Sequence, residues 1–239
     1  MDNNTILHVS FDFWRTLFKS NKMFSNARVN LLYNEYNPLG LSVDKISEII
    51  EAIGEKIDKI NSITLESISA SEMNADLLIN VGLNPNFEDL KIFEKRITDL
   101  FLEYPPILYN NITKVILEKL FDSNITLSLA SNTAFIMGDT LDLVLKDEGL
   151  LNFFKFQKYS DKLNRSKPSK DFFNSVYKSV LSLNERIILK SNILHVGDNF
   201  LADIQGASNF GFKTFQINSN SFSINDIFNE SNNFTFSNK

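Results

Sequence analysis

The chain contains no cysteine, only two histidines, and few of the residues that interrupt secondary structure. The absence of cysteine excludes disulfides, thiolate catalysis and cysteine-ligated zinc or iron–sulfur centres. His8 and His195 are too few for a histidine-based metal cluster. Eight glycines and five prolines in 239 residues argue against a long flexible linker. Disulfides, cysteine-based sites and histidine-based metal clusters are therefore excluded.

The chain also has no excess of positive charge and no long apolar run. Its net charge is −5, so there is no basic surface for nucleic acid and no polybasic patch for a membrane. No apolar run approaches the roughly 18 residues of a membrane span. Residues Met1 to Thr5 lack the pattern of a signal peptide, so we expect a cytoplasmic protein. An anionic substrate would need local help from a metal, a lysine or backbone N–H groups.

Strands and helices alternate over the second half of the sequence. The first expected strand is ILHVSF, residues 6–11, which is short, rich in β-formers and followed by Asp12. After Pro105 and Pro106, helices are expected at 111–122, 136–144, 169–181, 201–210 and 224–228, with strands at 125–130, 154–159, 193–196 and 213–217. This order predicts an α/β fold of the doubly wound, Rossmann type, with a parallel sheet and helices on both faces.

Residues 19–105 show only helical patterns, in contrast to the alternating strands and helices of the second half. Isoleucines recur at helical spacing between Ile46 and Ile60, and Ser42 can cap that helix. Further helices are expected at 23–36, 71–81 and 86–104. These helices could cover the sheet, but so many in succession are unusual within one α/β layer. We therefore predict an inserted all-helical subdomain over 19–105, with the core formed by 1–18 and 106–239.

Four polar side chains follow expected strands. Asp12, Ser131 and Asp198 come directly after strands, and Lys167 lies in the loop after the strand at 154–159. Each has an ordinary explanation alone, because Asp and Ser often cap helices and a loop lysine is often solvated. Ligands of open parallel sheets bind beyond the carboxyl ends of the strands, where all four would converge.

The chemistry of phosphoryl transfer fits this set. A carboxylate such as Asp12 can attack phosphorus, and Asp12 with Asp198 can share a Mg²⁺ ion. Lys167 can neutralise phosphoryl oxygens, and the Ser131 hydroxyl with nearby N–H groups, including those around Asn132, can hold another oxygen. Phosphoryl transfer requires mostly such positioning and charge stabilisation.

In order and spacing these segments resemble the four motifs of the haloacid dehalogenase-like (HAD) hydrolase superfamily. The motifs correspond here to 11–17 (FDFWRTL), 129–133 (LASNT), 166–168 (SKP) and 197–203 (GDNFLAD). The helical insert after the first motif resembles the C1 cap of that superfamily, which closes over the site and largely selects the substrate.

The resemblance implies roles for individual residues. It implies Asp12 as nucleophile, Asp198 as a Mg²⁺ ligand, and Asp203 as a carboxylate that orients the water shell of the metal or Lys167. It also implies that the backbone carbonyl at position 14 binds Mg²⁺. Thr16 is expected to support the turn after Asp12 rather than to react. The substrate implied is a small phosphorylated metabolite.

One departure matters, because phosphatases of this superfamily usually have a second Asp two residues after the nucleophile. Here that position is Trp14, whose indole is a hydrogen-bond donor but no useful acid at neutral pH. Losing a general acid/base typically slows a reaction by about 10²–10⁴-fold. Arg15 replaces a common glycine, either as a cation on the phosphate side or as a solvated surface residue.

Three functions remain open on the sequence. The first is a slow Mg²⁺-dependent phosphatase, which retention of Lys167, Asp198 and Asp203 favours. The second is a binding or regulatory protein that has lost turnover, as Trp14 would allow. The third is a metal-independent 2-haloacid dehalogenase, which the acidic fourth motif disfavours. The phosphonatases, with a small residue at this position, and the membrane-bound P-type ATPases fit less well.

Overall fold

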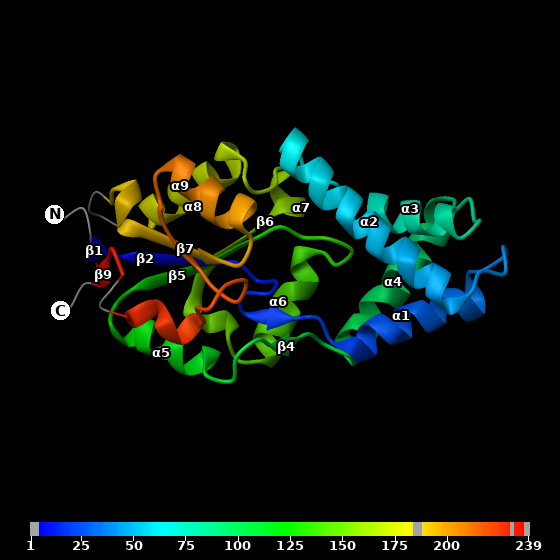
Figure 1. Cartoon of the computed structure of the whole chain (residues 1–239), viewed down its shortest axis with the longest axis horizontal. Helices are drawn as coiled ribbons and strands as arrows, with labels where there is room; N and C mark the ends of the chain where they lie inside the picture. Colours follow the sequence, from blue (N-terminus) through cyan, green and yellow to red (C-terminus); the bar gives the residue numbers. More distant parts are fainter. Residues whose placement is uncertain (1–4, 184–187, 230–231, 237–239) are drawn as a thin grey trace.

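The computed structural model describes residues 5–183, 188–229 and 232–236. Residues 1–4 and 237–239, which the sequence assigns to the ends of the core, lie outside these ranges. A sheet-containing part and a group of helices lie at opposite ends of the molecule (Figure 1). None of the described helices is both long enough and apolar enough to cross a bilayer.

The central sheet has five parallel strands, in the spatial order β6-β5-β2-β7-β8. Their bounds are β2 (His8–Phe11), β5 (Thr126–Ser131), β6 (Phe154–Tyr159), β7 (Ile193–Gly197) and β8 (Lys213–Gln216). Every residue of the inner strands β2 and β7 is buried, as expected for parallel strands that are covered on both faces. The predicted parallel sheet is confirmed.

Helices cover both faces of this sheet, as the alternating pattern predicts. α8 and α9 lie on one side, and α5 and α6 on the other (Figure 1). The bounds are α5 (Thr113–Asp122), α6 (Gly138–Asp147), α7 (Ser160–Leu163), α8 (Lys170–Ser182) and α9 (Gly206–Phe210). Short 3-10 helices span Leu151–Phe153, Lys190–Asn192 and Ile224–Phe228. The strand order reverses between β2 and β7, which is where doubly wound sheets bind ligands.

Four helices, α1–α4, follow one another between the first strand and the rest of the core. They are α1 (Lys22–Glu35), α2 (Val43–Thr64), α3 (Ala70–Asn80) and α4 (Phe87–Glu103). Side chains of Asn21, Ser42, Ser69 and Asn86 cap their N-termini. The expected all-helical insert is thus present as four consecutive helices. The boundaries 18/19 and 105/106 stay a prediction.

A small antiparallel pair lies where the chain enters and leaves the helical segment. β3 (Phe18–Lys19) pairs with β4 (Ile107–Leu108). Another two-stranded pair joins β1 (Thr5–Ile6) to β9 (Thr235–Phe236). Neither pair is evident in the sequence, because two-residue strands carry no periodicity and depend on partners about 90 or more residues away. The prediction that 19–105 contains no strand is therefore wrong at Lys19, the last residue of β3.

The segment predicted as a helix over 201–210 begins differently. Residues Phe200–Gln205 form a π-helix, and only Gly206–Phe210 form α9. The Asn199 side chain accepts hydrogen bonds from the N–H groups of Leu201 and Ala202 at this start. Single turns of π-helix are frequent at functional sites, and this one carries Asp203.

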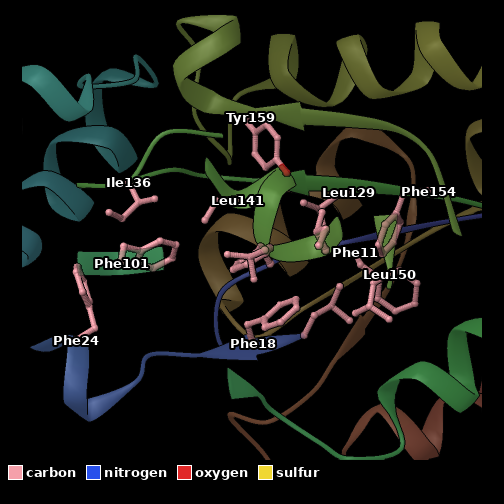
Figure 2. Packing of buried hydrophobic residues seen from close by; sticks show 14 of the residues in the cluster. Phe11, Phe18, Phe24, Phe101, Leu129, Ile136, Leu141, Leu150, Phe154 and Tyr159 are labelled. Carbon is pink, nitrogen blue, oxygen red and sulfur yellow. The ribbon is translucent and has the colours of Figure 1, made fainter. Parts of the chain in front are cut away.

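Phenylalanine fills the contact between the helical segment and the core. Phe24 of α1 and Phe101 of α4 pack edge to face, with ring centroids 5.2 Å apart. Figure 2 shows both near Ile136 of the core, while Phe11 and Leu129 occupy the sheet side of the same cluster. The space between the two parts is therefore walled by aromatic side chains.

Candidate active site

The carboxyl ends of three neighbouring strands bring Asp12, Ser131 and Asp198 together. Asp12 follows β2, and its N–H donates to the carbonyl of Val196 on β7 at 2.9 Å. Ser131 ends β5, and its Oγ donates to Asp12 Oδ1 at 2.8 Å. Asp198 follows β7 directly. Parallel pairing of these strands places the three side chains at one edge, because their carboxyl ends coincide there.

Lys167 joins two buried carboxylates. Its Nζ donates to Asp12 Oδ1 at 2.7 Å and to Asp203 Oδ1 at 2.5 Å. The Lys167 side chain is 2% exposed, and those of Asp12 and Asp203 are 8% and 2% exposed. A buried ammonium group is tolerated only where opposite charges and hydrogen bonds compensate it, as they do here.

Burial and charge act in opposite directions on these groups. Burial raises the pKa of Asp12, and Lys167 offsets part of that rise. Burial opposes the charge of Lys167, but Asp12 and Asp203 together outweigh it and raise the lysine pKa. Burial also opposes ionisation of Asp203, yet Lys167 and His195 hold the Asp203 pKa well below its ordinary range. Lys167 and Asp203 therefore stay charged at neutral pH.

Asp203 is held by a hydrogen-bond network that has no signature in the sequence. His195 Nε2 lies 3.2 Å from Asp203 Oδ1, and the Asn199 N–H donates to Oδ2 at 3.0 Å. The chain at Gly197 passes so close that a Cβ there would overlap the Asp203 carboxyl group, which explains the glycine. The one sequence feature that could have indicated this contact is the position of His195 on the strand that leads to Asp198.

Oxygen ligands for a metal ion are present. Carboxylate oxygens of Asp12, Asp198 and Asp203 all lie within 4.8 Å of one another. Both oxygens of Asp203 already accept hydrogen bonds, whereas no hydrogen bond of the described residues engages Asp12 Oδ2 or Asp198 Oδ1. A small set of carboxylate oxygens suits Mg²⁺, which keeps several waters. The donor set fits Mg²⁺ held by Asp12 and Asp198, with Asp203 behind them.

Asn132 and Thr16 also lie near the carboxylates, but Thr16 does not support its turn through its hydroxyl group as predicted. The Asn132 side chain bonds both the N–H and the carbonyl of Lys167, at 2.7 and 3.0 Å, and so fixes the lysine loop. The Thr16 hydroxyl is buried but has no hydrogen-bond partner among the described residues. Instead Asn218 Nδ2 donates to the carbonyls of Arg15 and Thr16 and supports that turn.

Trp14 and Arg15 lie beside the carboxylates. The Trp14 indole packs against Phe13 and against Phe101 of α4, with centroids 5.0 and 6.1 Å away. Arg15 has a left-handed backbone with φ 57°, a conformation that favours the glycine common at this position. Its exposed side chain reaches Asp198, with Nε 3.3 Å from Oδ2. Metal binding through the Trp14 carbonyl stays a prediction.

These groups open into a cavity of about 330 Å³ between the two parts of the molecule. The carboxylates and Lys167 form its polar end. Its walls include Trp14, Phe24 and Phe101, with Phe135 and Ile136 from the loop after β5. Small-molecule sites combine apolar walls with a few polar groups in this way.

Replacing Lys167 with methionine is expected to lower the free energy of unfolding by about 3–5 kcal/mol, because two buried carboxylates lose their partner. Lys162→Met is the matched control, since Lys162 forms an exposed pair with Asp139 and its loss should cost at most about 1 kcal/mol. Denaturant unfolding without metal measures both. Equal effects of the two substitutions would contradict the strong pairing of Lys167.

Comparison with known proteins places this geometry in a family. Residues 9–217 match the family model for haloacid dehalogenase-like hydrolases. No curated protein matches the chain.

Solved structures share the fold at low sequence identity. The HAD-hydrolase YfnB of Bacillus subtilis, determined bound to magnesium, has a TM-score of 0.69 at 19% identity, covering 94% of this chain and 97% of that one. A HAD phosphatase from Thermococcus onnurineus has a TM-score of 0.64 at 19% identity, covering 93% and 96%. A 2-haloacid dehalogenase from Pseudomonas syringae has a TM-score of 0.62 at 20% identity, covering 90% and 87%.

At these identities the structural likeness shows the fold alone, and it includes neighbours named as phosphatase and as dehalogenase. The family match is independent of it and covers both the sheet and the helical segment. The chain belongs to the haloacid dehalogenase-like hydrolases.

Proposed function

We propose that the protein is a Mg²⁺-dependent phosphatase that acts on a small phosphorylated metabolite through a phospho-aspartyl intermediate on Asp12. The observation that carries the proposal is the placement of Lys167 between Asp12 and Asp203, with Asp198 completing a three-carboxylate cluster. A dehalogenating site that works without metal has no need for this concentration of negative charge. Lys167 and Arg15 offset part of the mutual repulsion of these carboxylates, and a divalent cation would offset more of it.

The chemistry proceeds in two displacements. A carboxylate oxygen of Asp12 attacks phosphorus, a new O–P bond forms, and the bond from phosphorus to the ester oxygen breaks. Water then attacks the phosphoryl group, which releases inorganic phosphate and restores the Asp12 carboxylate. Ser131 and Lys167 hold Asp12 Oδ1 in place and neutralise charge on the phosphoryl oxygens. Bound Mg²⁺ would supply further charge neutralisation.

Trp14 limits this scheme, because the departing ester oxygen needs a proton that indole does not provide. Without a positioned acid, water must protonate the leaving group, so esters with acidic leaving groups should react fastest. The same residue motivates the alternative of a binding protein with little turnover. Trp14 and the apolar walls also fit the less favoured alternative of a 2-haloacid dehalogenase.

The test is a panel of phosphomonoesters and 2-haloacids, each assayed with Mg²⁺ and with a chelator. We expect phosphate release that requires Mg²⁺ and is faster for aryl phosphates than for alkyl phosphates. Absence of turnover on every ester would exclude the phosphatase. Halide release that persists in chelator would assign the dehalogenase instead.

Mg²⁺ affinity is expected to depend on pH through Asp198. Burial raises the pKa of Asp198 to about 7, and the nearby charges of Asp12 and Asp203 add to the rise. A proton competes with the metal for this carboxylate, so affinity should fall up to about tenfold per unit as pH drops below 7 and level off above it. Calorimetric titration with Mg²⁺ between pH 5.5 and 8.5, roughly 1.5 units on either side of that pKa, measures the profile. A flat profile would contradict a role for Asp198 as ligand.

A further inference from the structure

Arg28 lines the cavity from the side of the helical segment. It lies in the second turn of α1, and α1 presents one face to the cavity, formed by Asn21, Phe24, Ser25 and Arg28. The spacing of three, four and seven residues places these side chains in one row. The same row continues into the next turn with Leu31 and Leu32, which are both buried. The cavity face of α1 is thus anchored by buried side chains on either side of Arg28 along the helix.

Two phenyl rings hold the guanidinium group. Arg28 Cζ lies 5.3 Å from the ring centroid of Phe24 and 4.9 Å from that of Phe135. Phe135 belongs to the loop after β5, so the arginine contacts both parts of the molecule. Rings stacked on a guanidinium leave its N–H edge as the direction for hydrogen bonds.

Among the residues that the structure describes, none forms an ion pair with Arg28. Three described cations line the cavity; Lys167 pairs with Asp12 and Asp203, and Arg15 pairs with Asp198. No ion pair of the described residues includes Arg28, and its Nε is buried without a hydrogen-bond partner. Burial lowers the pKa of Arg28 only to about 10, so the group is charged at neutral pH. Arg28 is half-buried, and a shielded charge without a partner is costly, which implies that a ligand completes it.

We propose that Arg28 binds a second anionic group of the substrate, a carboxylate or a second phosphate, at the end of the cavity away from the reacting phosphoryl group. This inference rests on the proposed function, because the phosphoryl group is assigned to Asp12 and Lys167. The substrate class is then a phosphomonoester whose organic part is short, apolar against Phe101 and Ile136, and acidic at its far end. The planar fork of arginine suits both oxyanions, and unpaired polar groups reject ligands that lack the matching group.

Trp14 provides a direct measurement, because it is the single tryptophan of the chain and lines the cavity. The probes are phosphonates, which cannot be hydrolysed, titrated in the presence of Mg²⁺ and followed by tryptophan fluorescence. Matched pairs are 3-phosphonopropionate against propylphosphonate, and ethane-1,2-diphosphonate against ethylphosphonate. We expect at least about tenfold tighter binding of the doubly anionic member of one pair. For each pair, the ratio is the affinity for the doubly anionic probe divided by that for the singly anionic probe. The pair with the larger ratio shows whether Arg28 prefers a carboxylate or a second phosphate.

Arg28→Met removes the charge and keeps an apolar side chain between the two rings. The ratio should fall to about one, while the affinity for the singly anionic probe stays within about threefold. Arg96→Met is the matched control, because Arg96 lies over the Tyr36 ring on the same helical group and outside the cavity. If Arg28→Met does not melt cooperatively, Arg28→Gln serves in its place and should lose the preference for the doubly anionic probe in the same way.

Several results would overturn the proposal. They are equal binding of both members of each pair by the unmodified protein, a ratio that survives in Arg28→Met, and no binding of any probe. A merely structural role for Arg28 would lower the melting temperature and leave the ratio unchanged. If no ester is hydrolysed but the doubly anionic probe still binds more tightly, the proposed phosphatase activity alone is contradicted. If esters are hydrolysed but both probes of each pair bind equally, the anion site at Arg28 alone is contradicted.

Discussion

Trp14→Asp is expected to raise kcat for alkyl phosphates by about 10²–10⁴-fold in the presence of Mg²⁺. The substitution supplies a carboxyl group beside Asp12, where the leaving oxygen needs a proton. The gain should be smaller for aryl phosphates, because their leaving groups depart without protonation. Steady-state kinetics on one alkyl and one aryl ester measures the difference.

Trp14→Phe is the control for this substitution, because it keeps an aromatic side chain against Phe13 and Phe101 but adds no acid. It should leave kcat within about threefold of that of the unmodified protein. The aspartate variant is expected to lose some stability along with this packing, so melting is measured beside activity. A folded Trp14→Asp protein without any gain would mean that the missing acid does not limit the rate.

Asp12→Asn is expected to abolish phosphate release, with a loss of at least about 10³-fold, because the amide is a poor nucleophile and cannot form the phospho-aspartyl intermediate. The loss should be at least as large in the Trp14→Asp background, where the starting rate is higher. Asp99→Asn, which removes a carboxylate of an exposed pair with Lys95 on α4, should leave the rate unchanged.

The Asp12→Asn protein should stay folded, because burial already raises the pKa of this carboxyl group and the substitution removes one negative charge from the cluster. Loss of activity with intact melting therefore reports chemistry rather than unfolding. Residual activity near that of the unmodified protein would exclude Asp12 as the nucleophile.

The alternation of short apolar runs and amphipathic segments determines the α/β class and the parallel sheet. It succeeds because buried parallel strands and one-sided helices impose different periods on the sequence. The convergence of Asp12, Ser131 and Asp198 also follows from sequence, since each comes directly at or after the end of a strand and parallel strands end at one edge. Lys167 is less constrained, because its loop is fixed by Asn132 rather than by a strand.

Contacts between distant segments are what the sequence leaves open. The pairing of β3 with β4 and the π-helix that carries Asp203 have no local signature. His195 becomes a partner of Asp203 only after the turn at Asn199 brings the two together.

Sequence by itself therefore determined the class of fold, the family and the residues that meet at the strand ends, because periodicity and motif order are local properties of the chain. Tertiary structure decided which carboxylate oxygens stay free for a metal, and it placed α1 against the loop after β5 so that Arg28 faces the cavity. The physical reason is that hydrogen-bond partners and unpaired charges are set by segments that meet only in the folded protein.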